Sequence, residues 1–383
     1  MGLIRISCFP AISDTLAEEV EGLGFQVINK EFTAVEVHGE LEDTYQLNLH
    51  LRTANRILWH LNSFEASSPE ELYKEVNKMD WSRHFTINDY FSIYSVVKND
   101  NIKDTRFANL KFKDAVADHF MEKFGKRPDS GPERVQVVIY FHWKDKDCSV
   151  WLDTSGETIA RRGYRKIPYK APLQETLAAA IIRNTTWNKQ TTFIDPMCGS
   201  GTLAIEAALM AINKAPGFTR ADFGFKHINS YDPEYWNQLL KTARGNQISQ
   251  PEVKIIACDR DIVALNAAKT NAQKAGVDRL IDFVASDVFD LKIPAGPGVI
   301  ILNPPYGERL GQTTELVTLY SKIGDFFKQK CAGYSGYIFT GNPDLAKKVG
   351  LKTSKKTQFF NGKIECRLLE YELYSGSKKP GKQ

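Results

Sequence analysis

The first 155 residues alternate between short runs with a two-residue apolar period and longer runs in which apolar residues recur every three or four positions. The first pattern is typical of half-buried strands and the second of amphipathic helices. The start of the chain predicts strand 3–8, helix 15–24, strands 25–30 and 33–39, helix 41–54 and strand 56–64. The following residues predict helix 69–79, strand 90–98, helix 107–125 and strands 134–143 and 148–154.

The order strand-helix-strand-strand-helix-strand at the start is typical of a ferredoxin-like α+β unit, which we assign to residues 1–65. The second group of strands and helices indicates another α+β unit over residues 66–155. Neither unit contains a recognisable set of catalytic side chains. Any chemistry is therefore expected in the carboxyl-terminal part of the chain.

Beyond about residue 171 the pattern changes to short, almost wholly apolar runs, each followed by a helical pattern. Runs of this kind predict strands buried on both faces of a largely parallel sheet. The expected strands are 191–196, 253–259, 281–287, 298–305 and 334–342. Asn361-Gly362 then separates two alternating runs, which is the signature of a tight hairpin. We therefore expect an α/β domain over residues 161–383 whose sheet ends in an antiparallel pair.

The composition is that of a globular protein, with 42% hydrophobic and 25% charged residues. A chain of 383 residues favours two or three domains. No apolar run approaches the roughly 18 to 20 residues needed to cross a bilayer, and the start lacks the pattern of a signal peptide, so a cytoplasmic location is expected. The six cysteines are scattered without close pairs, which favours neither disulfides nor a zinc site, and no metal is expected.

The net charge of +4 does not by itself indicate a nucleic-acid partner. Residues 161–170, however, contain five basic residues, two tyrosines and no acid, a composition suited to phosphate contacts with aromatic stacking. A solvated linker is the alternative interpretation. The tail 346–383 has ten Lys or Arg against three Glu, and it could lie along RNA phosphates or be only a solvated basic tail.

A glycine-rich turn lies between the apolar run ending at Ile194 and the helical run that begins near Thr202. Glycines let the backbone approach a ligand, and a helix amino terminus offers free amide donors. A triphosphate cradle would need a lysine after Gly201, and a dinucleotide site would need an acid about 20 residues further on. Asp195 can instead accept from the cationic amino group of a methionine. The expected cofactor-binding residues here are Asp195, Pro196, Cys198, Gly199, Ser200, Gly201 and Thr202.

Acidic residues follow the next two predicted strands as well. Asp259 and Asp261 follow the second strand, where one of them could accept from the two hydroxyl groups of a ribose. Asp287 follows the third strand, where it could accept from the amino group of an adenine. Each aspartate alone could be a helix cap. Three in series at the edge where open sheets bind ligands favour a nucleoside cofactor.

Asn303-Pro304-Pro305-Tyr306 directly follows the apolar run 298–302. An exocyclic amino nitrogen is a poor nucleophile because its lone pair is delocalised into the ring of the base. The Asn303 side-chain oxygen and the Pro304 carbonyl can accept its two protons, Pro305 stiffens the loop, and Tyr306 can stack on the base. A rigid turn without chemistry is the alternative, but the pairing with the Asp195 loop disfavours it.

The two motifs, DPMCGSGT and NPPYGERL, closely resemble those of the methyltransferases that join a THUMP domain to a Rossmann-like catalytic domain. Among these, the bacterial 23S ribosomal RNA guanine 2-amino methyltransferases are the most similar. The resemblance implies a seven-stranded class I methyltransferase domain, S-adenosyl-L-methionine as cofactor and S-adenosyl-L-homocysteine as product. It also implies an RNA-binding THUMP signature over about 45–155, a role for Asn303 at the cofactor, and a cofactor-site wall that includes Pro172 and Leu173.

The main hypothesis is therefore an RNA methyltransferase acting on the guanine 2-amino group, with 23S ribosomal RNA or a ribosome precursor preferred over transfer RNA. An Asn-Pro-Pro-Tyr loop serves adenine equally well, so a DNA adenine methyltransferase is an alternative. A non-enzymatic RNA-binding assembly protein and a nicotinamide oxidoreductase are weaker alternatives. Oligomeric state is not indicated by the sequence.

Overall fold

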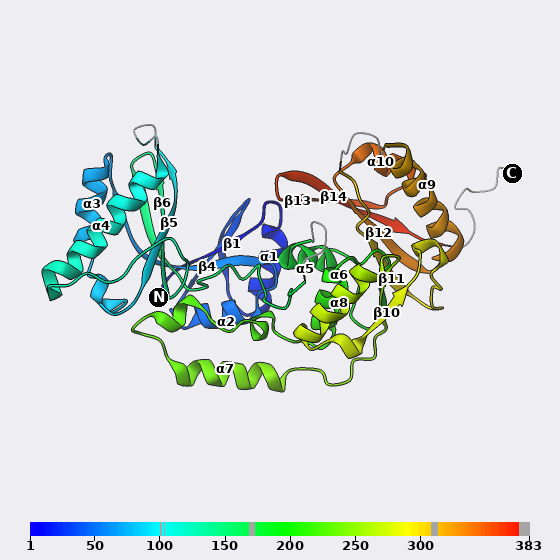
Figure 1. Cartoon of the computed structure of the whole chain (residues 1–383), viewed down its shortest axis with the longest axis horizontal. Helices are drawn as coiled ribbons and strands as arrows, with labels where there is room; N and C mark the ends of the chain where they lie inside the picture. Colours follow the sequence, from blue (N-terminus) through cyan, green and yellow to red (C-terminus); the bar gives the residue numbers. More distant parts are fainter. Residues whose placement is uncertain (100–101, 103, 168–172, 308–312, 375–383) are drawn as a thin grey trace. The chain divides into compact units, whose positions relative to one another are not determined.

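The computed structural model describes residues 1–99, 102, 104–167, 173–307 and 313–374, and the chain forms two compact units (Figure 1). The first unit consists of Met1–Cys8, Leu16–Arg161 and Ala215–Gly245. The second consists of Phe9–Thr15, Arg162–Lys214 and the chain from Asn246 onward. Among the described residues, no helix combines the length and apolar character needed to span a membrane.

The predicted elements of the amino-terminal half are all present. They are β1 (Gly2–Cys8), α1 (Ser13–Gly22), β2 (Val27–Glu31), β3 (Ala34–Gly39), α2 (Asp43–His50), β4 (Ala54–Glu65), α3 (Pro69–Asn77), β5 (Phe91–Lys98), α4 (Thr105–Phe124), β6 (Val137–Lys144) and β7 (Asp147–Asp153). A short 3-10 helix, η1 (Trp81–Arg83), follows α3. Ser68 caps α3 by accepting from the amide of Glu71, as a serine before a Pro-Glu-Glu start predicts.

The strands of both predicted α+β groups form one seven-stranded sheet, in the order β2-β3-β1-β4-β7-β6-β5. The 12-residue strand β4 joins the groups because it pairs antiparallel with β1 on one side and with β7 on the other. β5 and β6 are parallel neighbours. The pattern of the sequence places each strand, but it does not reveal that the two groups share a sheet.

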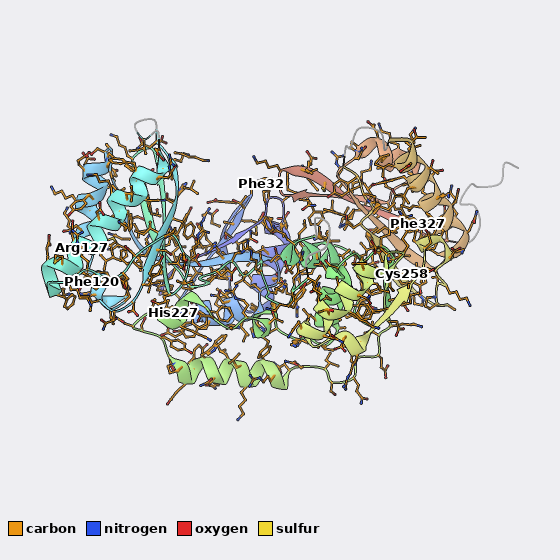
Figure 2. The ribbon with its side chains drawn as sticks, viewed as in Figure 1. Phe32, Phe120, Arg127, His227, Cys258 and Phe327 are labelled. Carbon is orange, nitrogen blue, oxygen red and sulfur yellow. The ribbon has the colours of Figure 1, made fainter. Side chains whose placement is uncertain are left out.

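Aromatic side chains fill the core beside β5 and β6. α4 packs on β5, and α3 packs on α4 (Figure 1). Phe112 stacks on Phe141 at 4.7 Å between ring centroids, and Phe120, marked in Figure 2, lies 4.9 Å from Phe85. The indole of the fully buried Trp81 donates to the carbonyl of Val76 at 2.9 Å. This polar contact satisfies the only indole donor of a ring buried to fill the core.

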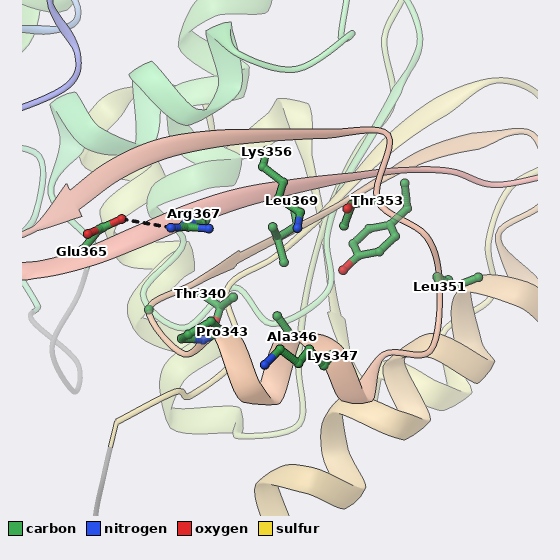
Figure 3. Close-up of a pocket in the computed structure, with 12 residues that line it drawn as sticks. Thr340, Pro343, Ala346, Lys347, Leu351, Thr353, Lys356, Glu365, Arg367 and Leu369 are labelled. Atoms are coloured by element: carbon green, nitrogen blue, oxygen red, sulfur yellow. Dashed lines mark hydrogen bonds and ion pairs between the residues drawn. The ribbon is translucent and has the colours of Figure 1, made fainter.

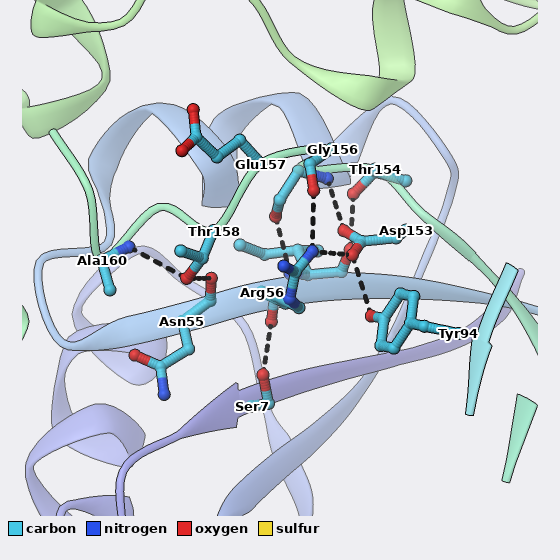
Figure 4. A network of polar contacts seen from close by, with 12 residues as sticks. Ser7, Asn55, Arg56, Tyr94, Asp153, Thr154, Gly156, Glu157, Thr158 and Ala160 are labelled. Atoms are coloured by element: carbon cyan, nitrogen blue, oxygen red, sulfur yellow. Dashed lines mark hydrogen bonds and ion pairs between the residues drawn. The ribbon is translucent and has the colours of Figure 1, made fainter. Parts of the chain in front are cut away.

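A buried ion pair ties β4 to β7 (Figure 4). The Arg56 guanidinium donates to the Asp153 carboxylate and, at 2.7 Å, to the carbonyl of Gly156. The Tyr94 hydroxyl donates to the same carboxylate at 2.9 Å. The backbone amide of Ser155 donates to it as well, at 3.0 Å. Because Asp153 is shielded from water, removal of Arg56 would leave a buried carboxylate without a counter-charge.

Residues 215–245 lie between two strands of the catalytic sheet in sequence but pack in the first unit. They include the 3-10 helices η2 (Pro216–Thr219) and η3 (Gly224–His227) and the helix α7 (Pro233–Gly245). Phe225 stacks on Tyr45 at 4.2 Å between centroids, and Trp236 packs edge-on against both rings. Arg220 donates to the carbonyls of Ser155, Glu157 and Thr158. The segment is therefore anchored by aromatic packing and by a buried guanidinium.

The second unit contains the predicted α/β sheet. Its elements are α5 (Glu175–Arg183), β8 (Thr192–Asp195), α6 (Thr202–Ala211), β9 (Ile255–Asp259), α8 (Ile262–Ala275), β10 (Ile281–Ala285), β11 (Gly298–Leu302), α9 (Thr313–Lys330), β12 (Tyr334–Thr340), α10 (Pro343–Lys348), β13 (Lys355–Asn361) and β14 (Ile364–Glu372), with the short 3-10 helices η4 (Asp278–Leu280) and η5 (Val288–Asp290). The order is β10-β9-β8-β11-β12-β14-β13. β14 runs antiparallel to both neighbours, and Gly362 adopts a φ of 62° in the two-residue turn of the predicted hairpin.

Helices cover the sheet of the second unit. α5, α6 and α8 pack in a row, and α9 packs on α10 (Figure 1). α9 contributes Tyr320, Ile323 and Phe327 to a core that also holds Ile300 and Ile338 from the sheet; Phe327 is marked in Figure 2. The continuous apolar runs of the strands thus correspond to burial on both faces.

Gly324 determines how closely α9 and α10 approach. A Cβ atom at this position would lie 1.8 Å from the carbonyl oxygen of Val349, which is backbone and cannot turn away. We predict that Gly324→Ala lowers the free energy of unfolding of the second unit by about 3 kcal/mol, measured by urea denaturation. Gly22→Ala adds a methyl group at an open helix position of the first unit, where nothing lies within 4 Å of the added Cβ, so as a control it should leave the unfolding of the second unit unchanged. Equal urea midpoints for Gly324→Ala and the wild type would contradict the prediction.

Candidate active site

The carboxyl ends of the parallel strands bring the predicted site residues to one edge of the sheet. β8 lies between β9 and β11, and Asp195 pairs with Ala257 while Ile194 pairs with Ile300. Asp259 ends β9, and Asn303 follows β11 directly. The strand order changes direction around β8, and at such a point open α/β sheets leave a crevice for a ligand.

The turn after β8 has the tight backbone that its glycines predict. Gly199 and Gly201 have φ values of 53° and 84°, in the left-handed region that favours glycine. A Cβ on Gly201 would lie 2.8 Å from the Cβ of Ala268 in α8, so the glycine also permits close helix packing. The turn is anchored to β9 because the amide of Cys198 donates to the carbonyl of Cys258 at 2.9 Å.

Asp195 is the most unusual ionisable group of this edge. Its side chain is only 1% exposed, and neither carboxylate oxygen has a hydrogen-bond partner within the described part of the chain. Burial, aided by the negative charge of Asp259 and only partly opposed by the nearby backbone amides of Ala204 and Met197, raises the pKa of Asp195 to about 8. A buried carboxylate without a donor is costly, and a cationic group placed against it would stabilise its charged form.

The other acidic residues occupy different positions. Asp259 accepts from the amides of Gly199 and Asp261, each at 2.9 Å, and so links β9 to the glycine turn. Asp261 caps α8 by accepting from the amide of Val263, and Asp287 caps η5 by accepting from the amide of Phe289. Asp261 and Asp287 therefore do act as helix caps, which was the alternative interpretation of these residues. The predicted contacts with ribose and adenine stay predictions.

Asn303 and Tyr306 differ in how firmly they are held. The Asn303 side chain is half-buried and makes no hydrogen bond to any residue that the structure describes. The Tyr306 hydroxyl accepts from the side-chain amide of Asn361 at 2.9 Å, and the ring packs edge-on against Phe339. Burial raises the pKa of Tyr306 to about 12. The loop therefore presents a free amide beside a tyrosine fixed by the β13–β14 hairpin.

The basic segment after residue 161 faces inward at its start, so its interpretation as a phosphate-binding surface is wrong for Arg162 and Tyr164. Both are buried, and both donate to the Glu206 carboxylate of α6, at 2.8 and 3.0 Å. Arg165 donates to the carbonyl of Leu173 and the hydroxyl of Thr202. A buried acid in the helix after the glycine turn explains why these side chains turn toward the protein.

Sequence reasoning missed Glu206 and Asn271, which hold this segment against the glycine turn. Asn271 in α8 is 1% exposed; its amide oxygen accepts from the amides of Lys166 and Ile167, and its nitrogen donates to the carbonyl of Ser200. A lone acid within the otherwise almost wholly apolar helix α6 is the signal that could have identified Glu206. Asn271 lies among several other polar residues of α8 and carries no such signal.

The remaining predicted cofactor residues lie on or next to the turn. Leu173, Cys198, Ser200 and Thr202 are buried, Pro304 is buried and Pro305 is exposed. Pro196 begins the turn. Pro172 lies outside the described residues. No group of three or more His, Cys, Asp or Glu side chains among the described residues could hold a metal ion.

Comparison with family models accounts for most of the chain. Residues 4–58 match the RlmL ferredoxin-like domain, and residues 66–153 match the THUMP domain. Residues 162–370, which include the glycine turn and the Asn303 loop, match the RMKL-like methyltransferase domain. The chain belongs to the RMKL-like methyltransferase family. Membership in this family confirms the predicted resemblance and fold.

Two relatives show how the chain compares in length. It is 37% identical over 372 residues to the ribosomal RNA large subunit methyltransferase K/L of Syntrophotalea carbinolica, covering 94% of this chain and 52% of the relative. It is 34% identical over 358 residues to the candidate RNA methyltransferase slr0064 of Synechocystis, covering 94% of this chain and 93% of the relative. The chain thus spans about half the length of the K/L relatives and nearly all of slr0064.

Solved structures agree in fold over nearly the whole chain. The protein SMU.472 in complex with SAH (S-adenosylhomocysteine) is 28% identical, with a TM-score of 0.88 and coverage of 99% of each chain. A possible methylase from Clostridium difficile 630 is 30% identical, with a TM-score of 0.87 and the same coverage. A Listeria monocytogenes protein named as a predicted N6-adenine-specific DNA methylase is 27% identical, covers 98% of this chain and 96% of that one, and has a TM-score of 0.87.

The raised pKa of Asp195 gives a testable pH dependence. The folded state holds this proton up to about pH 8, whereas the unfolded chain releases it near its ordinary pKa of 3.8. The stability that the proton contributes is complete below about pH 4 and is lost as pH rises to about 8. Asp195→Asn removes this dependence. We predict that its unfolding free energy relative to wild type rises with pH, by up to about 1.4 kcal/mol per unit.

Urea unfolding without ligand at several pH values from 5 to about 8 measures this difference. Asp282→Asn is the control, because it removes a carboxylate that is 65% exposed and solvated in both states. A constant difference between Asp195→Asn and wild type across this range would contradict the prediction.

Proposed function

We propose that this chain transfers a methyl group from S-adenosylmethionine to the exocyclic amino group of a base in RNA, with the guanine 2-amino group of large-subunit ribosomal RNA as the preferred target. The observation that carries the proposal is the free amide of Asn303, held at the same sheet edge as the unpaired carboxylate of Asp195. The Asn303 amide could accept a proton of the amino group to be methylated, and the Asp195 carboxylate could accept from the ammonium group of the cofactor.

The residues around the glycine turn fit S-adenosylmethionine. Asp195 lacks a partner and would accept from the cofactor's ammonium group, which would stabilise the carboxylate in its charged form. The left-handed glycines bring backbone amides close to a ligand at the start of α6. Asp259 and Asp287 would accept from the ribose and adenine groups. The cofactor supplies a methyl group on a positively charged sulfur, and no metal is needed for its transfer.

The Asn303 loop would prepare the nitrogen for attack. The Asn303 side-chain oxygen and the Pro304 carbonyl would accept the two amino protons and so direct the nitrogen lone pair toward the methyl group. S-adenosylmethionine would supply the methyl group and leave as S-adenosylhomocysteine, and one amino proton would pass to water once methylation has made the nitrogen acidic. Tyr306, fixed by Asn361, would pack against a base that has left its stack.

RNA is favoured over DNA by the amino-terminal half. Residues 66–153 match the THUMP domain, and the K/L relatives and slr0064 carry RNA methyltransferase names. The names of the K/L relatives also support ribosomal RNA over transfer RNA, and a cytoplasmic location is part of the proposal. A second candidate is DNA adenine methylation, which the name of the Listeria structure favours. The Asn303 loop is compatible with either base.

Methyl transfer to purified nucleic acids tests the proposal. Labelled S-adenosylmethionine is incubated with the chain and, separately, with total RNA or DNA from cells that lack this protein, and the nucleosides are analysed. We expect label in 2-methylguanosine of the large ribosomal RNA. Label in transfer RNA would change the target, label in methyladenine of DNA would favour the second candidate, and no label in any substrate would overturn the enzymatic function.

Asn303 should act in methyl transfer rather than in cofactor binding. We predict that Asn303→Ala lowers the rate of transfer by about 100-fold or more, because the amino protons lose an acceptor, while cofactor affinity changes by less than about three-fold. Calorimetry with S-adenosylhomocysteine measures the affinity. Asn246→Ala removes an exposed asparagine of the same unit and should change neither quantity. Loss of both in Asn303→Ala would instead indicate a structural role.

A further inference from the structure

A pocket that contains none of the predicted site residues lies in the methyltransferase unit (Figure 3). It has a volume of about 460 Å³ and opens between α10 and the β13–β14 hairpin. This volume falls within the range of sites that hold small organic ligands. Gly341, which follows β12, lines the pocket, and a Cβ on it would lie 3.0 Å from the Tyr306 ring. The pocket is therefore separated from the predicted base-binding tyrosine by a single glycine.

The two sides of the pocket differ in character. Its floor is apolar, with Leu369 almost fully buried and Ala346 and Leu351 packed on the same core. Its rim is basic, because the charged residues that line it are Lys347, Lys356 and Arg367, with Glu365 as the acidic one. An apolar slot with a cationic rim matches one nucleotide, whose base is flat and apolar on its faces and whose phosphate is anionic.

The rim cations are unequally available. Lys347 pairs with Asp344 at 2.8 Å, and Arg367 lies 3.4 Å from Glu365. Lys356 is exposed and forms no ion pair with any residue that the structure describes. It also lies opposite Leu369 in the β13–β14 register, directly above the apolar floor (Figure 3). Lys356 is therefore the rim group best placed to meet a phosphate.

We propose that this pocket binds a nucleotide that flanks the target base, and so holds the RNA strand while that base enters the site beside Tyr306. This inference rests on the proposed function and adds to it a contact that selects single-stranded or unstacked substrate. The flanking base lies on the Leu369 floor, and its phosphate lies between Lys356 and Arg367. Both contacts form on the hairpin that also fixes Tyr306 through Asn361.

Binding of a fluorescent single-stranded RNA oligonucleotide of about a dozen nucleotides tests the pocket without methyl transfer. Lys356→Ala should raise the Kd about three- to ten-fold and reduce the slope of log affinity against log salt by about 0.7, the value for one lost phosphate contact. Glu365→Gln should lower the Kd, because it removes the acid from the rim. Lys355→Ala is the matched control, since Lys355 is the exposed neighbour on the same strand and does not line the pocket.

Kinetics with the RNA substrate separate this inference from the proposed function. Lys356→Ala should raise the KM for RNA by a similar factor, with kcat and S-adenosylhomocysteine affinity changed less than about two-fold. If the wild type binds the oligonucleotide but methylates no RNA, the proposed function fails, and the Kd and salt slope still decide the pocket. If Lys356→Ala matches Lys355→Ala in Kd, salt slope and KM, the pocket does not bind RNA and the inference is overturned.

Discussion

The carboxyl group of Asp195 lies at the end of the central strand β8, almost without exposure, and neither of its oxygens makes a hydrogen bond to a described residue. Folding alone gains nothing from such a group, because burial without a partner costs free energy. The surrounding chain is nevertheless arranged closely around it. The glycine turn begins at its neighbour, Asp259 anchors that turn, and α6 starts where the turn ends. The surrounding chain thus fixes the position of Asp195 without giving its side chain a hydrogen-bond partner, which suits the proposed contact with a cationic ligand.

Buried polar contacts hold those surroundings in place. Glu206 accepts from Arg162 and Tyr164, and Asn271 joins the backbone near Ile167 to that of Ser200. These groups have nearly no exposure, so each hydrogen bond offsets the desolvation of its partners rather than adding much net stability. Their consequence is positional. They fix the approach of the chain to the glycine turn, whereas the Asn303 side chain after β11 makes no hydrogen bond to any described residue.

The first unit follows a different principle, in which distant parts of the chain complete one sheet and one aromatic core. β4 pairs with both β1 and β7, so the ferredoxin-like and THUMP domains share one continuous sheet. Residues 215–245 add Phe225 and Trp236 to Tyr45, although they lie within the methyltransferase domain in sequence. A segment that belongs to the methyltransferase domain in sequence therefore packs in the first unit.

The sequence by itself determined the strands and helices of the amino-terminal half, the parallel sheet with its terminal hairpin, and both site motifs. These depend on local periodicity, glycine turns and residues at strand ends. The helix α7 was not predicted. Tertiary structure decided the rest. The inward turn of Arg162 depends on Glu206, about forty positions away, and Tyr306 is fixed by Asn361 from the hairpin. The pocket beside Tyr306 combines α10 with β14. Such pairings depend on which distant side chains meet after packing, which local patterns do not encode.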